Sequence, residues 1–329
     1  MDLAAFCDQS RVVVVAGKGG VGKSTVAASL ALLASEAGRS VLIVELEGKS
    51  AISAAFAAAS PLAYEETELR PGSVSSAGDV KGRIRARRLT PDDALLEYLG
   101  DHGLQRVSKR LMSSGVIDVV ATAIPGIKDV LLLGKVKQLE RERSADLIIV
   151  DAPATGHAVT FLTSASGLLD VARGGPVRTQ AADVVEFLSD PSRCRITLVT
   201  LPEEMPIKET VESAYLLEDR AGVTLGPVVV NGCLAVDAGL FGDTRTAARA
   251  AGVSVDEATE LALESARKFS VARHELQARQ IENLSSELPL PELTLPLLAA
   301  DSIGPDELRR LTDALIDGVD RLRDEVAPR

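Results

Sequence analysis

The chain has 329 residues, of which 46% are hydrophobic and 25% charged. Its formal net charge of −11 disfavours nonspecific binding to nucleic acid or to an anionic membrane surface, because both need a dominant basic surface. No run of residues approaches the roughly 20 apolar positions of a membrane span, and Asp2 and Asp8 lie where a secretory signal would be basic and then apolar. We therefore expect a cytoplasmic protein with no nucleic-acid partner and no stable membrane insertion.

The three cysteines, Cys7, Cys194 and Cys233, are far apart in the sequence and form no Cys-x-x-Cys pair. This distribution favours reduced, buried thiols in a cytosolic protein. A metal or metalloid site assembled from distant parts of the chain is the alternative.

Residues 17–25 read Gly-Lys-Gly-Gly-Val-Gly-Lys-Ser-Thr and follow four consecutive valines. The pattern Gly-x-x-x-x-Gly-Lys-Ser thus lies between a buried strand and a helix start, which is the context of a phosphate-binding loop. Glycines let the backbone turn tightly and direct successive N–H groups at one anion. We expect Lys23 to add a point charge on the phosphates and the Ser24 hydroxyl to be a Mg²⁺ ligand. The residues expected to bind nucleotide are Gly19, Gly20, Val21, Gly22, Lys23, Ser24 and Thr25.

Lys18 is a second lysine, placed early in this loop. The loop resembles the deviant Walker A of the dimerising P-loop ATPases, which include relatives of ArsA, Min, Par and the nitrogenase iron protein. The resemblance implies that Lys18 reaches across a two-fold interface to the partner's nucleotide, so that the active unit is a dimer. An exposed loop lysine without this role is the alternative.

The next elements predict the opening of a doubly wound, mostly parallel sheet. Residues 26–37 are rich in alanine and leucine and indicate a helix, and residues 41–45 form an apolar strand, so the ligand is expected at the carboxyl ends of the strands. In ArsA-like ATPases an aspartate just past this strand is taken to orient the attacking water. Glu47 stands at that position here, which suggests it as the water-positioning carboxylate; Glu45 and a solvated loop charge are alternatives.

Residues 51–135 are expected to be a mainly helical insertion in one P-loop ATPase domain that spans residues 1–329. Residues 80–87 alternate apolar and basic side chains, which predicts a strand with a basic outer face. This pattern favours a charged edge strand, and a docking face for an acidic partner is the alternative. Thr90-Pro91-Asp92-Asp93 indicates a helix start. The tail-anchored-protein-targeting relatives carry a methionine-rich client groove in this region, and Met112 is the one methionine here.

Residues 145–150 predict a third buried strand, which ends at Asp151. An aspartate in this place suits a carboxylate behind the Mg²⁺ ligands. The run Asp-Ala-Pro-Ala-Thr-Gly-His, residues 151–157, resembles the second switch of ArsA-like ATPases. We interpret His157 as a helix-start or switch residue because no second histidine or cysteine lies at ligand spacing.

The remaining residues predict further strands and helices of the same sheet. Strands are expected at 195–200, 227–230 and 293–298, with helices at 236–284 and at the carboxyl end of the chain. The family resemblance places Asn231 against the adenine edge and Pro296 and Leu297 in the adenine-side loop. A turn-forming asparagine is the alternative at residue 231.

The resemblance covers about residues 11–325 and is closest to the ArsA and tail-anchored-protein-targeting branch. It implies Mg²⁺-dependent ATP hydrolysis at a two-fold interface, with ATP and Mg²⁺ as cofactors and Lys18, Lys23, Glu47 and Asp151 as catalytic residues. The partner is a second copy or a related ATPase, and the protein client is unknown. The alternative is a slow nucleotide-dependent switch, half of a heterodimer, that recruits a protein partner; a Par- or Min-like positioning protein and an ATP-dependent ligase are more distant possibilities.

Overall fold

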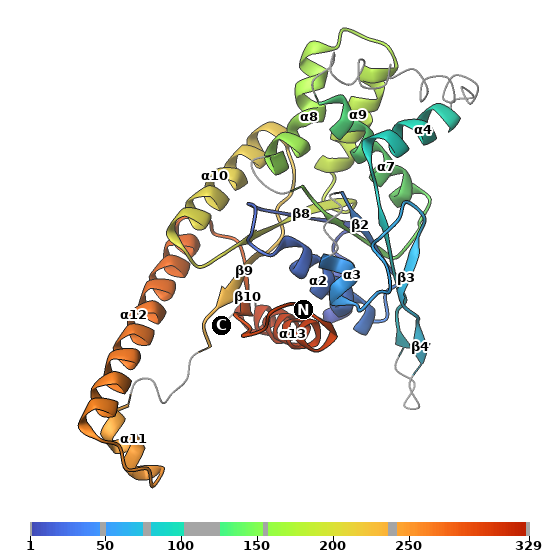
Figure 1. Cartoon of the computed structure of the whole chain (residues 1–329). Helices are drawn as coiled ribbons and strands as arrows, with labels where there is room; N and C mark the ends of the chain where they lie inside the picture. The colour runs from blue at the N-terminus through green and yellow to red at the C-terminus, as the bar shows by residue number, and fades with distance from the viewer. Residues whose placement is uncertain are drawn as a thin grey trace.

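The protein is built around one eight-stranded, mostly parallel sheet (Figure 1). The computed structural model describes residues 2–46, 51–74, 80–101, 126–153, 157–235 and 242–326. Every strand of this sheet pairs in parallel except β3, which is antiparallel to β6 at one edge. In spatial order the strands are β10 (Glu292–Pro296), β9 (Val228–Cys233), β8 (Cys194–Thr200), β1 (Val12–Ala16), β7 (Leu147–Asp151), β2 (Val41–Glu45), β6 (Ile84–Arg88) and β3 (Thr67–Arg70). The doubly wound α/β fold expected from the sequence is confirmed.

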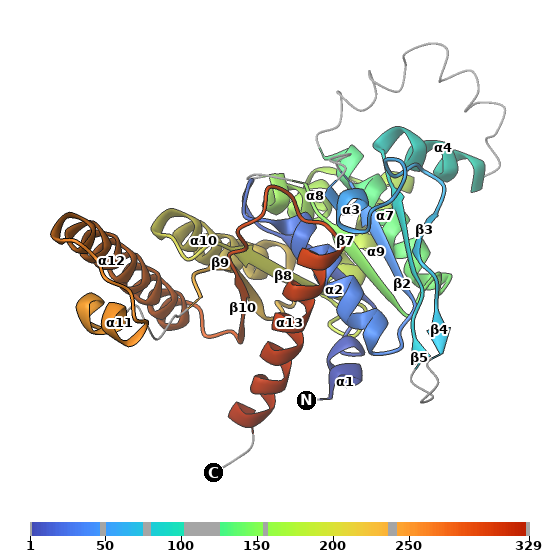
Figure 2. The same ribbon diagram turned by 60° about the horizontal axis from the view of Figure 1, so that its bottom comes forward.

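Helices cover both faces of the sheet (Figures 1 and 2). Side chains alternate along a strand, so Val12 and Val14 of β1 pack into one hydrophobic cluster while Val15 packs into the other. The first cluster takes in α7 (Ile127–Arg141), α8 (His157–Val171), α9 (Pro176–Ser189) and α10 (Glu204–Ala221). The second takes in α1 (Leu3–Cys7), α2 (Lys23–Glu36), α3 (Ala51–Ala55) and α13 (Pro305–Val326).

The segment 51–135 contributes to the sheet as well as to the helical layers. Strands β6 and β3 extend the sheet beyond β2, and β4 (Ser73–Val74) pairs with β5 (Val80–Lys81) in a separate hairpin. The strand expected at residues 80–87 corresponds to β5 and β6, whereas β3 and β4 were not expected from the sequence. Strand β6 lies inside the sheet because β3 takes the edge. Helix α4 (Pro91–Asp101) starts as expected, with the Asp93 amide donating to Thr90 Oγ1 at 3.2 Å. Met112 lies outside the described residues.

Helices α11 (Thr244–Ala250) and α12 (Glu257–Glu287) form an arm that projects from the body of the molecule (Figures 1 and 2). Leu284 is the one fully buried residue of α12, near the end where this helix packs on α10. Leu261 and Phe269, nearer α11, are 64% and 66% exposed. Among the described residues, no helix has both the length and the apolar composition needed to cross a membrane.

Candidate nucleotide site

The glycine-rich loop joins the carboxyl end of β1 to the start of α2. Gly17, Gly20 and Gly22 adopt φ values of 150°, 86° and 92°, a region that side chains with a Cβ rarely occupy. A Cβ at Gly17 would lie 2.3 Å from the Val199 carbonyl oxygen. The strand, the glycines and the helix start thus form the loop that the sequence predicts.

The start of α2 is open to an anion. Gly22 precedes the helix in the left-handed conformation, and no side chain caps the helix among the described residues. The first N–H groups of a helix have no partner within it, and they carry the positive end of its dipole. A phosphate at this position would accept from these groups.

Lys23 is folded back over the loop. Its residue is only 6% exposed, and its Nζ donates a hydrogen bond of 3.0 Å to the carbonyl oxygen of Lys18. A buried ammonium held against the loop backbone supplies positive charge at the expected phosphate position. The role of Lys23 on the phosphates, inferred from the motif, stays a prediction.

Ser24 and Asp151 meet at the same end of the sheet. Ser24 Oγ donates a hydrogen bond of 2.6 Å to Asp151 Oδ2, and Asp151 is buried as the last residue of β7. A hydroxyl next to a carboxylate offers the oxygen donors that Mg²⁺ prefers. The two residues therefore fit a magnesium site, with Ser24 as ligand and Asp151 behind it.

A pocket of about 220 Å³ opens beside these groups. Its size suits a polyphosphate, and its walls combine backbone, one lysine and one carboxylate. The described residues that line it are Gly20, Gly22, Lys23, Ser24, Thr25, Ala51, Asp151 and Ala152.

The two carboxylates considered for water positioning are placed differently. Glu45 is the last residue of β2, is 1% exposed, and is not among the described residues that line this pocket. Glu47 lies outside the described residues, as do residues 154–156 of the expected second switch. His157 is the first residue of α8, which agrees with its expected place at a helix start.

Asn231 lies against the loop from the neighbouring part of the sheet. Its Nδ2 donates a hydrogen bond of 2.9 Å to the Val21 carbonyl oxygen, and a Cβ on Gly22 would lie 2.3 Å from that Nδ2. The side chain thus holds the loop in addition to any contact with a base. This second role was not anticipated from the sequence, because only the fold brings residues 21 and 231 together.

Pro296 is the last residue of β10, the strand beside β9, and Leu297 follows it. Pro296 of β10 pairs with Cys233 of β9, and the Leu297 amide donates to the Cys233 carbonyl oxygen at 2.7 Å. Leu297 is 53% exposed, so its apolar side chain is available to cover a ring. Pro296 and Leu297 thus lie beside Cys233, two residues along β9 from Asn231, and their place on the adenine side stays a prediction.

The Lys18 side chain forms an ion pair with Glu209 of α10. Sequence reasoning did not identify Glu209, since an acidic residue on the polar face of an amphipathic helix carries no signal of its own. The contact joins residues 191 positions apart. Lys18 is thus held by its own chain in this structure.

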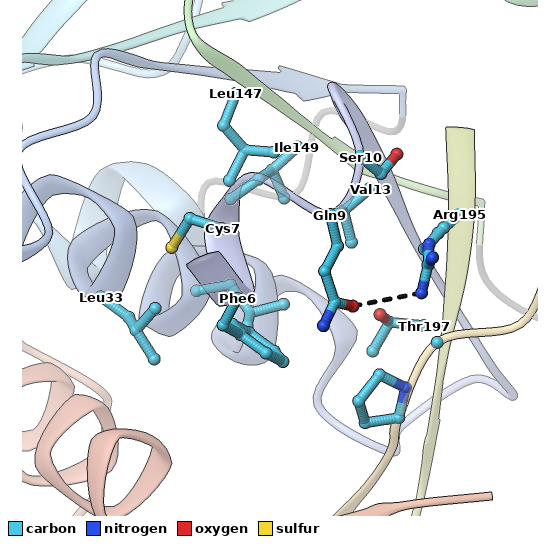
Figure 3. Close-up of a pocket in the computed structure, with 13 residues that line it drawn as sticks. Phe6, Cys7, Gln9, Ser10, Val13, Leu33, Leu147, Ile149, Arg195 and Thr197 are labelled. Carbon is cyan, nitrogen blue, oxygen red and sulfur yellow. Dashed lines mark hydrogen bonds between the residues drawn. The ribbon is translucent and has the colours of Figure 1, made fainter. Parts of the chain in front are cut away.

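A separate cavity of about 40 Å³ lies towards the amino ends of the strands (Figure 3). Phe6, Val13 and Leu147 give it an apolar wall, and at its rim Arg195 Nη1 donates to Gln9 Oε1 at 3.1 Å. A cavity of about 40 Å³ has room for a few water molecules at most, which is too little for a nucleotide. This cavity is a packing defect between α1 and the sheet and not a candidate for the nucleotide site.

The cysteines show no metal-binding arrangement. Cys7 and Cys194 are buried, and burial raises the pKa of both thiols, that of Cys7 to about 12. Burial also raises the pKa of Cys233 to about 11. Within the described part of the chain, no three His, Cys, Asp or Glu residues gather as a metal site.

Comparison with known proteins identifies the family. Residues 10–171 match the profile of the family described as anion-transporting ATPase, whose short name is ArsA ATPase. The matched range contains the loop, Lys23, Ser24 and Asp151. The chain carries an ArsA-like P-loop ATPase domain.

Individual relatives agree with this assignment. ATPase BagA of Mycobacterium tuberculosis is 37% identical over 230 residues, which cover 67% of this chain and 64% of the relative. ATPase get3 of Schizosaccharomyces japonicus is 31% identical over 150 residues, or 46% of this chain and 42% of the relative. The arsenical pump-driving ATPase of Escherichia coli is 22% identical over 303 residues, or 91% of this chain and 43% of the relative. The ArsA-like chain thus spans less than two thirds of the length of these relatives.

Proposed function

We propose that this ArsA-like ATPase hydrolyses ATP at a two-fold interface between subunits and acts in the cytoplasm. Binding and hydrolysis then change the shape of the dimer, and this change acts on a protein client. The observation that carries the proposal is the loop itself, in which a buried Lys23 lies over left-handed glycines at the open start of α2. Such an arrangement supports binding of the phosphates of a nucleotide.

The magnesium part of the proposal rests on Ser24 and Asp151. When bound, Mg²⁺ would neutralise charge on the phosphates. Ser24 would supply an oxygen ligand, and Asp151 would orient the Ser24 hydroxyl through the hydrogen bond described above. Lys23 and the N–H groups of the loop would stabilise the charge that develops on the transferred phosphoryl group.

Attack by water needs a group to position it, and we assign this role to Glu47. The burial of Glu45 within the sheet, away from the pocket lining, supports the choice between the two carboxylates. In the dimer Lys18 would add its charge to the partner's nucleotide. The partner is a second copy of the chain or a related ATPase.

A second candidate is a slow nucleotide switch, one half of a heterodimer, whose ATP state recruits a protein. Glu47 favours it, because glutamate is one methylene longer than the aspartate that the family carries at this position. Turnover of the isolated chain separates the two, since brisk turnover without a partner contradicts the switch.

The test of ATP binding and hydrolysis is Lys23→Ala in the full chain. We expect loss of hydrolysis and at least tenfold weaker binding of a fluorescent ATP analogue. Lys208→Ala is the matched control, because Lys208 is an exposed lysine of α10 paired with Glu204. Normal turnover in Lys23→Ala would contradict the proposal.

A further inference from the structure

We propose that Glu209 is a positioning residue for Lys18. It holds the Lys18 ammonium against α10 in the separate subunit and releases it when two subunits close around ATP. This inference rests on the proposed function, in which Lys18 acts on the partner's nucleotide.

The contact itself is the starting observation. Lys18 Nζ pairs with Glu209 Oε1, while the Lys18 carbonyl oxygen accepts from Lys23 Nζ at 3.0 Å. The backbone of Lys18 is therefore tied to the phosphate-binding lysine and its side chain to α10. If binding of phosphates moves Lys23, the movement is passed directly to Lys18 through this hydrogen bond.

The second oxygen of Glu209 explains why this carboxylate needs a cation. Oε2 is buried and accepts no hydrogen bond from the part of the chain that the structure describes. Burying a carboxylate oxygen without a donor costs free energy, and a neighbouring ammonium offsets part of that cost. Lys18 is the cation paired with Glu209 in this structure.

The surroundings leave room for the side chain to move. Lys18 and Glu209 line a pocket of about 370 Å³ between the loop, α8 and α10. Thr160 of α8 lines the same pocket, and α8 begins six residues after Asp151. The ion pair thus lies where the loop, α8 and α10 meet.

The strength of the pair suits a reversible hold. The side chains of Lys18 and Glu209 are 48% and 31% exposed, and ion pairs at exposed positions are weak. A contact of this kind biases an equilibrium by about two- to fivefold and does not block it. Contacts with the partner's phosphates are charge-assisted and can replace it.

The experiment measures ATP-dependent association of the full chain. Glu209→Gln keeps the size of the side chain and removes its charge, and Glu212→Gln is the matched control because Glu212 lines the same pocket from the same helix. Sedimentation with Mg²⁺ and a non-hydrolysable ATP analogue gives the dissociation constant of the subunits. We expect Glu209→Gln to tighten association about two- to fivefold, with KM for ATP lowered and kcat little changed, and Glu212→Gln to behave as wild type.

A second background identifies the cause. In Lys18→Met the Glu209→Gln change should have no further effect on association, because the charge that Glu209 holds is absent. Two results would contradict the role of Glu209 without affecting the proposed function. One is a Glu209→Gln chain that associates as wild type does or more weakly. The other is an equal effect of Glu209→Gln on association in the wild-type and Lys18→Met backgrounds.

A further outcome concerns the dimer. If the wild-type chain bound ATP through Lys23 and yet remained a monomer, that result would contradict the proposed two-fold interface and also the proposed release of Lys18 from Glu209. Binding of the fluorescent ATP analogue to wild type and Lys23→Ala in the same samples distinguishes that failure from a failure at Glu209.

Discussion

Ser24 Oγ lies 2.6 Å from Asp151 Oδ2, although the two residues are 127 positions apart in the chain. The contact exists because β1 and β7 are neighbours in the sheet, with Val15 opposite Asp151. The carboxyl ends of parallel strands meet at one edge, and the loop after β1 folds back over that edge. A hydroxyl and a carboxylate from distant sequence segments thereby form one oxygen-rich corner.

Asp151→Asn should separate nucleotide binding from hydrolysis. Asparagine keeps the shape of the side chain but removes the charge that favours Mg²⁺, so we expect near-normal ATP binding and a loss of kcat on the order of 100-fold. Steady-state turnover over a Mg²⁺ titration measures this. Asp146→Asn is the control. Asp146 lies just before β7, at the end of that strand opposite Asp151, and it accepts hydrogen bonds from Ser40. Turnover of Asp146→Asn should match wild type.

Gly22→Ala should damage the phosphate loop. A Cβ at Gly22 would meet Asn231 Nδ2 at 2.3 Å, and the φ of 92° adds strain of about 1–2 kcal/mol for any side chain. We expect ATP affinity to fall by at least tenfold in isothermal titration calorimetry. Gly20→Ala has the strain without the contact and should lose less. Gly174→Ala, with open space around it, should bind normally; equal affinities in all three would contradict this account.

Substitutions of Glu45, at the end of β2, and of Glu47, two residues later, should have different effects. Glu47→Gln should lower kcat on the order of 100-fold with little change in stability, since it removes a group that positions water. Glu45→Gln should keep turnover within a few-fold, because the side chain is buried in the sheet, and should lower the melting temperature. Paired turnover and thermal-melting measurements test this. The reverse pattern would assign the water-positioning role to Glu45.

Stability should fall at alkaline pH through the buried thiols. Burial raises the pKa of Cys194 well above its usual range and that of Cys7 to about 12. Their contribution is fully present below the unfolded pKa of about 8.5 and is lost as pH rises towards the folded value. At pH 10.5 each thiol would lower the unfolding free energy by roughly 2–3 kcal/mol.

Denaturant unfolding from pH 7 to 10.5 measures this loss, and Cys194→Ala supplies the comparison. The variant should start less stable, because it leaves a small cavity, but should lose less stability as pH rises. If the pH profiles of wild type and Cys194→Ala were parallel, the pKa of the Cys194 thiol would be the same in the folded and unfolded states. That result would contradict the prediction.

The phosphate loop and the strand before it could be predicted because their signals are local. Gly22, Lys23 and Ser24 occur in one motif, and the valines of β1 form a continuous apolar run of the kind that buried parallel strands require. The Asp151 position followed from the same logic at the end of β7. The family relationship then matched residues 10–171.

Other features depend on contacts between distant segments and have no local signal. Glu209 is one of several acidic residues of α10, and only the packing of that helix brings it to Lys18. The strand at residues 84–88 was expected from its alternation, but its neighbour β3 was missed because Thr67–Arg70 contains three polar residues. Consequently β6 was expected at the edge, whereas Arg87 is buried and stacks on Tyr64 at 4.4 Å.

The arm of α11 and α12 gives the molecule two regions of unequal local stability. At about 1.5 Å per residue the 31 residues of α12 reach about 46 Å, and most of that length has no core beneath it. Amide hydrogens there should exchange with solvent by local opening, whereas those of β1 and β7 should exchange only through global unfolding. The outer turns of α12 can therefore fray and reform many times while the nucleotide site stays folded.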